Sequence, residues 1–144
     1  MMISVKTELS MGHRLYGYPG KCANLHGHNY GFEFWISGNP DAALGLVMDF
    51  KDLKETVDEV LEPFDHCMLL MDGDPFEPSL IANNSRHQIL TVNPSAENIG
   101  SLMYNLLMNE GVGIVKVCVS ETADTSVQVI RVDREVRVLR GLII

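Results

Sequence analysis

The stretch Asn29 to Ser37 reads NYGFEFWIS and carries the clearest strand pattern in the chain. Tyr30, Phe32, Phe34 and Ile36 stand at every second position, and mostly smaller or polar residues separate them. Successive side chains of a strand point to opposite faces, so this alternation predicts a strand with one buried face.

Further along the chain, two segments have apolar residues at helical spacing. The first is Lys51 to Leu61, with Asp49 placed to cap its start. The second is Ser95 to Glu110, which has Glu97 in its first turn and Gly111 at its exit. Both segments predict amphipathic helices.

Three other segments predict strands, namely Met2 to His13, Gly113 to Glu121 and Ser126 to Val132. The last two are close enough in sequence to form a hairpin. The segment Leu70 to Asn93 predicts a long, mostly irregular loop. The resulting order of elements predicts an α+β fold, with an antiparallel sheet that carries its helices on one face.

Length and composition limit the possibilities further. With 144 residues and 46% hydrophobic residues, the chain fits a single domain over 1–144 with a substantial core. Its formal net charge of −8 argues against binding to nucleic acid or to an anionic membrane. No apolar run is long enough to span a bilayer and no signal-peptide pattern follows Met1, so we expect a cytoplasmic protein.

His13, His26 and His28 are three of the five histidines and lie within sixteen residues. In extended chain, His26 and His28 project to the same face, and the glycine between them leaves room. His13 reaches the same point if the two strands pair. Three imidazoles with one open coordination position are typical of a catalytic zinc site.

Spacing alone leaves two alternatives open. The histidines can be ordinary strand-end residues without an ion, although their concentration in one short stretch counts against this. Alternatively, Cys22 closes the site as a fourth ligand, and the zinc only staples two strands together in a non-catalytic module. The other two cysteines, Cys67 and Cys118, fit buried packing positions, and the irregular spacing of all three argues against a disulfide framework.

Six segments in order along the chain carry a more specific signal. They are LSMGHRL (Leu9 to Leu15), CANLHGHNY (Cys22 to Tyr30), VMDFKDL (Val47 to Leu53), Asp65-His66, PSAEN (Pro94 to Asn98) and Glu121-Thr122. Together they resemble the family of 6-pyruvoyltetrahydropterin and 6-carboxytetrahydropterin synthases. The chain departs from the family pattern at Gly12, Ser95 and Leu70, where alanine, threonine and asparagine are usual.

The resemblance implies a T-fold, in which an antiparallel four-stranded sheet carries two helices on one face. It also implies that three subunits join their sheets into a barrel and that two such trimers stack into a homohexamer. Closing the barrel removes exposed sheet edges, which is a physical reason for the assembly.

The resemblance also implies the site. His13, His26 and His28 match the zinc ligands, and Cys22 matches a proton-transfer residue. Asp65 and His66 match an acid–base pair that acts with this cysteine. Glu121 matches the residue that anchors the pterin ring, with Thr122 beside it.

The implied substrate is 7,8-dihydroneopterin triphosphate. Three residues separate Cys22 from His26, as in the carboxy enzymes of queuosine biosynthesis. This favours a zinc-dependent carbon–carbon lyase that forms 6-carboxy-5,6,7,8-tetrahydropterin and releases acetaldehyde and triphosphate. The alternative is a 6-pyruvoyltetrahydropterin synthase, which only eliminates triphosphate. Arg14, Lys21 and Arg86 are the basic candidates for holding the triphosphate.

Overall fold

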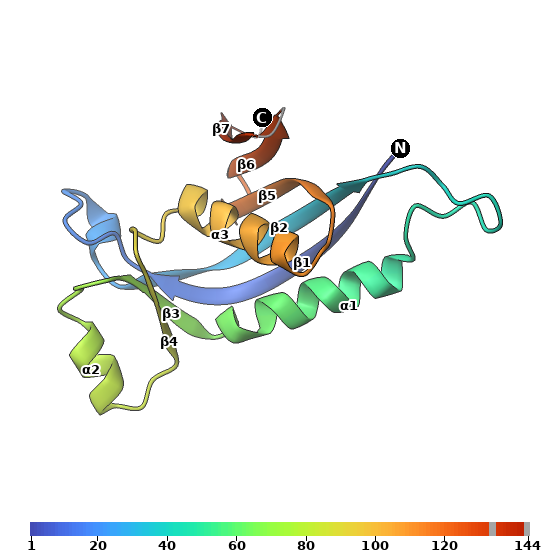
Figure 1. Cartoon of the computed structure of the whole chain (residues 1–144). Helices are drawn as coiled ribbons and strands as arrows, with labels where there is room; N and C mark the ends of the chain where they lie inside the picture. The colour runs from blue at the N-terminus through green and yellow to red at the C-terminus, as the bar shows by residue number, and fades with distance from the viewer. Residues whose placement is uncertain (133–134, 143–144) are drawn as a thin grey trace.

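A computed structural model describes residues 1–132 and 135–142 of the chain (Figure 1). The helices are α1 (Phe50–Leu61), α2 (Glu77–Ala82) and α3 (Ala96–Asn109), with short 3-10 turns η1 (Lys21–Ala23) and η2 (Glu62–Phe64). The strands are β1 (Met2–His13), β2 (His26–Ser37), β3 (Cys67–Met71), β4 (His87–Leu90), β5 (Ile114–Thr122), β6 (Thr125–Val132) and β7 (Glu135–Leu142).

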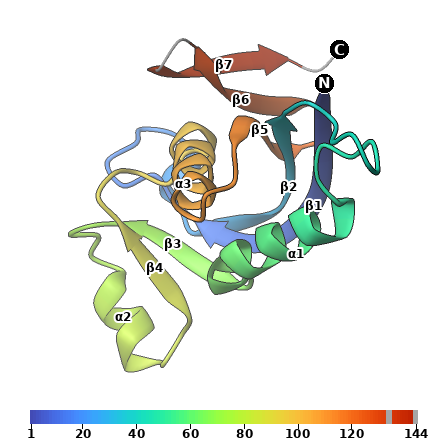
Figure 2. The same cartoon turned by 45° about the vertical axis from the view of Figure 1, so that its right-hand side comes forward.

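All the described strands join one curled sheet in the order β4-β3-β1-β2-β5-β6-β7. The run β1-β2-β5-β6-β7 is antiparallel, whereas β3 pairs in parallel with both β1 and β4. Helices α1 and α3 cover the same face of the sheet (Figure 2). The predicted α+β fold with its helices on one face of the sheet is therefore confirmed, although the sheet is wider than the four strands that the resemblance implies and is partly parallel.

The extra width comes partly from Leu70 to Asn93, which is more regular than predicted. This segment contains the end of β3 and the whole of α2 and β4. The prediction of a mostly irregular loop was wrong because these elements are only four to six residues long. Such short elements leave little periodicity, and a parallel strand that is buried on both faces does not alternate.

Both long helices begin where the sequence predicts. The Asp49 side chain accepts a hydrogen bond from the Lys51 N–H at 2.7 Å, and the Ser95 side chain accepts one from the Asn98 N–H at 3.4 Å. Helix α3 ends before Gly111, whose φ of 78° suits glycine. The buried stripes of the two helices belong to one hydrophobic core with Tyr30, Phe32 and Phe34 of β2.

Two residues of strand β5, Val115 and Cys118, are only partly buried. Val117 and Val119 are buried on the helix-covered face, but a bulge in the pairing with β2 leaves Val115 only partly buried. Cys118 points to the opposite face and is also only partly buried, so its predicted burial was wrong. Cys67 is buried as predicted, and all three cysteines are free thiols.

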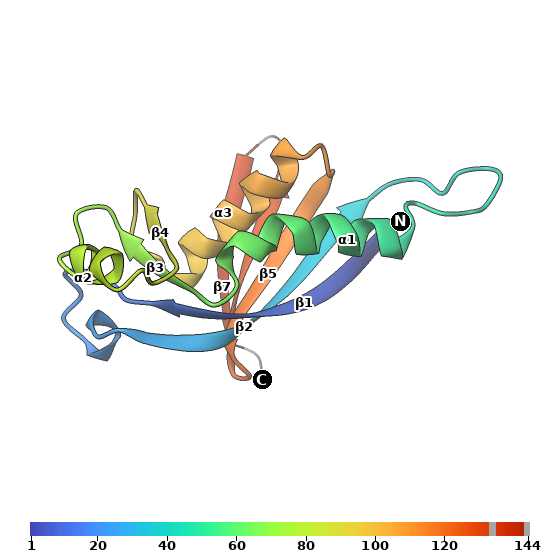
Figure 3. The same ribbon diagram turned by 90° about the horizontal axis from the view of Figure 1, so that it is seen from below.

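β1 and β2 pair along their whole length and bring His13 opposite His26 and Met11 opposite His28. Seen from below, these two strands form a long curved floor, and the loop 38–49 extends beyond it (Figure 3). The end of the floor that carries the histidines is the end farther from this loop.

No helix in the described part of the chain is long and apolar enough to cross a membrane.

Candidate metal centre and pocket

The three predicted histidines converge at one end of the β1-β2 pair. One ring nitrogen from each of His13, His26 and His28 lies within 4.8 Å of the other two. Cross-strand pairing explains this, because residues opposite each other, and residues two apart on one strand, share a face. A group of three imidazoles at this spacing can hold a metal ion.

Two glycines let the strands approach closely at this point. Gly12 and Gly27 pair across β1 and β2. A Cβ at position 27 would lie 2.8 Å from the Met11 carbonyl oxygen and 3.4 Å from the Gly12 Cα, which is too close for any other residue without a backbone shift. The glycine between His26 and His28 is therefore part of the geometry of the group.

Backbone carbonyls orient two of the rings. The Nδ1 of His13 lies 2.7 Å from the Pro94 oxygen, and the Nδ1 of His26 lies 2.8 Å from the Asn24 oxygen. A carbonyl oxygen only accepts, so each Nδ1 carries the proton and each Nε2 keeps its lone pair. Metal-binding histidines in proteins are held by outer partners of this type.

The electrostatics of His13 also suit a metal ligand. The pKa of His13 is lowered, chiefly because the ring is buried, while the Pro94 hydrogen bond and the nearby Glu121 act in the opposite direction. His26 and His28 lower it further through charge repulsion. A lowered pKa keeps the ring neutral near pH 7, and only a neutral imidazole donates its lone pair to a metal.

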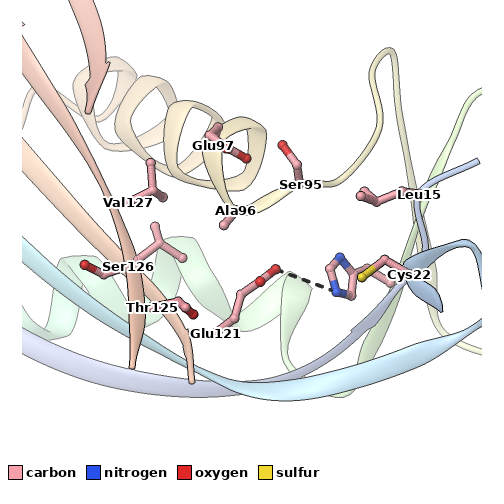
Figure 4. A pocket seen from close by; sticks show the side chains of 11 residues that line it. Leu15, Cys22, Ser95, Ala96, Glu97, Glu121, Thr125, Ser126 and Val127 are labelled. Atoms are coloured by element: carbon pink, nitrogen blue, oxygen red, sulfur yellow. Dashed lines mark ion pairs between the residues drawn. The ribbon is translucent and has the colours of Figure 1, made fainter. Parts of the chain in front are cut away.

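A pocket opens beside His13, between the η1 loop and the N-terminus of α3. Cys22 lines it from η1, Glu121 from the end of β5, and Ser95 and Glu97 from the start of α3 (Figure 4). The dashed line in Figure 4 joins Glu121 and His13, whose Oε1 and Nε2 atoms are 3.8 Å apart and form an ion pair only when the ring is protonated. The pocket thus joins three predicted site residues of different roles, namely His13, Cys22 and Glu121.

Tyr30 links the histidines to Glu121. Its hydroxyl lies 3.0 Å from the His13 Nε2 and donates a hydrogen bond to the Glu121 carboxylate at 3.2 Å. The side chain is fully buried, and burial together with the charge of Glu121 raises the pKa of Tyr30. The sequence predicted only a core aromatic here, but a buried tyrosine hydroxyl within a phenylalanine series needs a polar partner, which was the available signal.

Asp65 and His66 do not lie in this pocket. Asp65 accepts hydrogen bonds from the His66 ring at 2.8 Å and from the Ser10 N–H at 3.2 Å. These bonds lower the pKa of Asp65, that from His66 most. The His66 ring is 78% exposed and lines a different hollow, with Gly12 and Met68.

His66 also has an unusual backbone, because its φ of 52° lies in the left-handed region that few non-glycine residues adopt.

Thr122, like Asp65 and His66, is absent from the residues lining the pocket that contains Cys22. Its hydroxyl contacts the Thr125 hydroxyl at 2.9 Å within the β5-β6 turn.

Two of the three basic candidates for the triphosphate already have acidic partners. Arg14 is buried, with its Nε 3.0 Å from Asp74, and its guanidinium lies over the Phe76 ring. Arg86 pairs with Glu62 at 3.0 Å. Both contacts tie the segment around α2 to the rest of the fold.

Residues 2–131 match the family model described as 6-pyruvoyl tetrahydropterin synthase. The chain belongs to this family. The resemblance seen in the sequence is thereby confirmed, and the match covers the whole of the site.

Curated relatives in this family carry the carboxy name. A putative 6-carboxy-5,6,7,8-tetrahydropterin synthase of Archaeoglobus fulgidus is 35% identical over 124 residues, which cover 86% of this chain and 90% of the relative. The 6-carboxy-5,6,7,8-tetrahydropterin synthase of Haemophilus influenzae is 34% identical over 116 residues, covering 75% of this chain and 82% of the relative. The chain is thus similar to carboxy-branch synthases over most of their length.

Solved structures support the same fold. The 6-pyruvoyl tetrahydropterin synthase of Caenorhabditis elegans aligns with a TM-score of 0.64 and 22% identity, covering 98% of this chain and 95% of the other. A 6-pyruvoyltetrahydropterin synthase of Plasmodium vivax aligns with a TM-score of 0.67 and 23% identity, covering 91% and 98%. At this level of identity the likeness concerns the fold alone.

Proposed function

We propose that this protein is a zinc-dependent lyase that converts 7,8-dihydroneopterin triphosphate into 6-carboxy-5,6,7,8-tetrahydropterin, with release of acetaldehyde and triphosphate. The observation that supports the proposal is the pocket lined by His13, Cys22 and Glu121, since His13 also belongs to the group of three histidines. The carboxy names of several relatives at 34–36% identity support the choice of reaction. The setting we propose is queuosine biosynthesis in the cytoplasm.

Zinc is the ion we propose for His13, His26 and His28. Three neutral imidazoles suit zinc, and the group of converging ligand atoms does not include the Cys22 sulfur. This favours a site with an open position over one closed by a fourth protein ligand. Zinc bound there would act as a Lewis acid toward the oxygens of the substrate side chain.

The residues of the pocket divide the remaining work. Glu121 is the proposed anchor for the pterin, because one carboxylate can accept two adjacent N–H groups of the ring in parallel. Its side chain is 30% exposed, so it is accessible from the pocket, and the Tyr30 hydroxyl donates a hydrogen bond to it. Thr122 follows it and is proposed to assist. Cys22, on the opposite side, is the proposed proton-transfer group.

Asp65 and His66 are proposed to complete the site from another subunit. Within one chain neither residue lines the pocket that contains Cys22, and His66 lines a different hollow. The proposed homohexamer offers each pocket a neighbouring chain, so the exposed His66 ring of one chain can serve the Cys22 pocket of the next.

Product analysis tests the reaction. The zinc-loaded protein is incubated with 7,8-dihydroneopterin triphosphate, the pterin product is identified by mass spectrometry, and acetaldehyde is measured with a coupled dehydrogenase. Equal amounts of acetaldehyde and the carboxy product are expected. Triphosphate release without acetaldehyde would identify the pyruvoyl reaction instead. A protein that holds one zinc per chain but shows no turnover would support the non-catalytic module, in which zinc only joins two strands.

A further inference from the structure

Asn93 ties together two segments that are far apart in the sequence. Its side-chain oxygen accepts a hydrogen bond from the Tyr16 N–H at 2.7 Å, and its side-chain N–H donates to the Tyr16 carbonyl at 3.0 Å. One amide therefore satisfies both backbone groups of Tyr16, as a neighbouring strand would do. This pair of hydrogen bonds between Asn93 and Tyr16 fixes the chain three residues after His13.

The backbone of Asn93 is fixed as well. Its carbonyl accepts hydrogen bonds from the Ser95 N–H and from the Asn98 side chain, both at 2.8 Å. Asn98 lies in the first turn of α3, so the contact with Tyr16 continues directly into this helix. The end of β1 and the start of α3 are thereby joined through one residue.

The next residue makes the connection to the histidine group. The carbonyl of buried Pro94 accepts the hydrogen bond from the His13 Nδ1 at 2.7 Å. The peptide group of this carbonyl includes the Ser95 N–H, which donates to the Asn93 carbonyl at 2.8 Å, so the position of the Pro94 carbonyl depends on Asn93. Asn93 supports both sides of this bond, because it binds Tyr16 in the segment that follows His13 and it precedes the proline.

The two oriented histidines differ in this respect. His26 donates to the Asn24 carbonyl, only two residues away, so local chain geometry suffices. His13 donates to a carbonyl 81 residues away. Only the His13 contact therefore requires a tertiary support.

We propose that Asn93 is a positioning residue for the metal site. By binding Tyr16, it holds the Pro94 carbonyl against the His13 Nδ1, which leaves Nε2 as the nitrogen free to bind an ion. This inference rests on the proposed function only in taking the histidine group to bind zinc. Loss of such an outer partner typically weakens metal binding by about 10- to 100-fold.

The test compares Asn93→Ala with Asn83→Ala. Asn83 also donates a side-chain hydrogen bond, to the Ser79 carbonyl at 2.7 Å, but it lies at the end of α2 and its hydrogen bonds stay within that helix. Zinc affinity is measured for both variants and the wild type by competition with a chromophoric chelator. We expect Asn93→Ala to bind zinc about 10- to 100-fold more weakly and Asn83→Ala to bind as the wild type does.

A second readout separates positioning from general stability. In the metal-free wild type, the His13 Nδ1 proton is buried and hydrogen-bonded, so it should give an exchange-protected ring N–H signal in NMR spectra. We expect Asn93→Ala to lose this signal while its circular dichroism stays native. If Asn93→Ala does not fold, Asn93→Ser, which keeps a small polar side chain, takes its place in both measurements with the same expected results.

The outcomes are distinct. A folded Asn93 variant with wild-type zinc affinity and an intact His13 signal would overturn the role of Asn93 and leave the proposed function untouched. A wild-type protein that binds no zinc would instead remove the proposed function. Weaker zinc binding by both alanine variants would also count against a specific role for Asn93.

Discussion

At the scale of single residues, His13 connects the sheet with the pocket and with the loop that precedes α3. It is only 2% exposed, and its two ring nitrogens contact Pro94 on one side and Tyr30 on the other. Burial and the hydrogen bond from Nδ1 to Pro94 leave the ring little freedom to rotate, so the folded chain fixes the position of Nε2.

Substitutions of Cys22 and His28 should have different effects on zinc content and turnover. Cys22→Ala should keep about one zinc per chain, because three histidines remain, but turnover should fall by roughly a hundredfold to ten-thousandfold. His28→Ala should lose zinc and activity together. Elemental analysis and the product assay measure both effects. Loss of zinc from Cys22→Ala would show instead that the cysteine is a fourth ligand.

Tyr30→Phe removes the hydroxyl that supports Glu121 without opening a cavity. The carboxylate then loses its buried donor, which is worth about 1 kcal/mol, so affinity for a non-reacting neopterin should fall roughly fivefold. Zinc content should stay unchanged. Fluorescence titration measures the affinity, and Tyr104→Phe, at a second buried tyrosine in α3, is the matched control. Equal affinities for the two variants would contradict the support of Glu121 by Tyr30.

At the scale of elements, helix α3 packs tightly against the sheet at Gly100. A Cβ there would lie 3.0 Å from a methyl group of Val129 and 3.1 Å from one of Val119, both fully buried. Gly100→Ala gains helix propensity of up to about 1 kcal/mol but overpacks two stiff β-branched side chains, which costs about 1–3 kcal/mol.

The free energy of unfolding of Gly100→Ala should therefore fall by roughly 1 kcal/mol in a denaturant titration. Combining it with Val129→Ala should reduce the cost of the glycine substitution, since one of the two close contacts is then removed. A more stable Gly100→Ala single variant would mean that the sheet yields easily at this point.

The elements also show which parts of the structure the sequence alone predicts. Helices α1 and α3 are predictable because Asp49 and Ser95 cap long periodic segments. β3 and β4 are not, because their pairing partners are distant and a five-residue run such as Cys67 to Met71 fits a strand or a helix end equally well.

The site divides in the same way. The convergence of His13, His26 and His28 follows from strand alternation and pairing, which the sequence reveals. The bonds from Asn93 to Tyr16 and from Tyr30 to Glu121 join residues 77 and 91 positions apart, so no local pattern indicates them. The separation of Asp65 and His66 from Cys22 is likewise a property of the folded chain.

At the scale of the whole molecule, the sheet of one chain has two outer strands, β4 and β7. Strand edges carry unpaired backbone groups that favour further pairing, and the proposed barrel would use them. Light scattering at micromolar concentration should give a mass six times that of one 16.0 kDa chain. A stable monomer under these conditions would count against the proposed assembly and against a site shared between subunits.

Mixing inactive variants tests the shared site directly. Cys22→Ala and His66→Ala should each be inactive when assembled alone, because every pocket lacks one group. Unfolding them together in equal amounts and refolding them should produce mixed oligomers. If each pocket takes Cys22 from one chain and His66 from another, about one quarter of the pockets then carry both groups, and activity should return to about that fraction. If both groups act within one chain, no pocket is ever complete and the mixture stays inactive. Refolding each variant separately and then combining the finished oligomers is the control, and it should restore nothing.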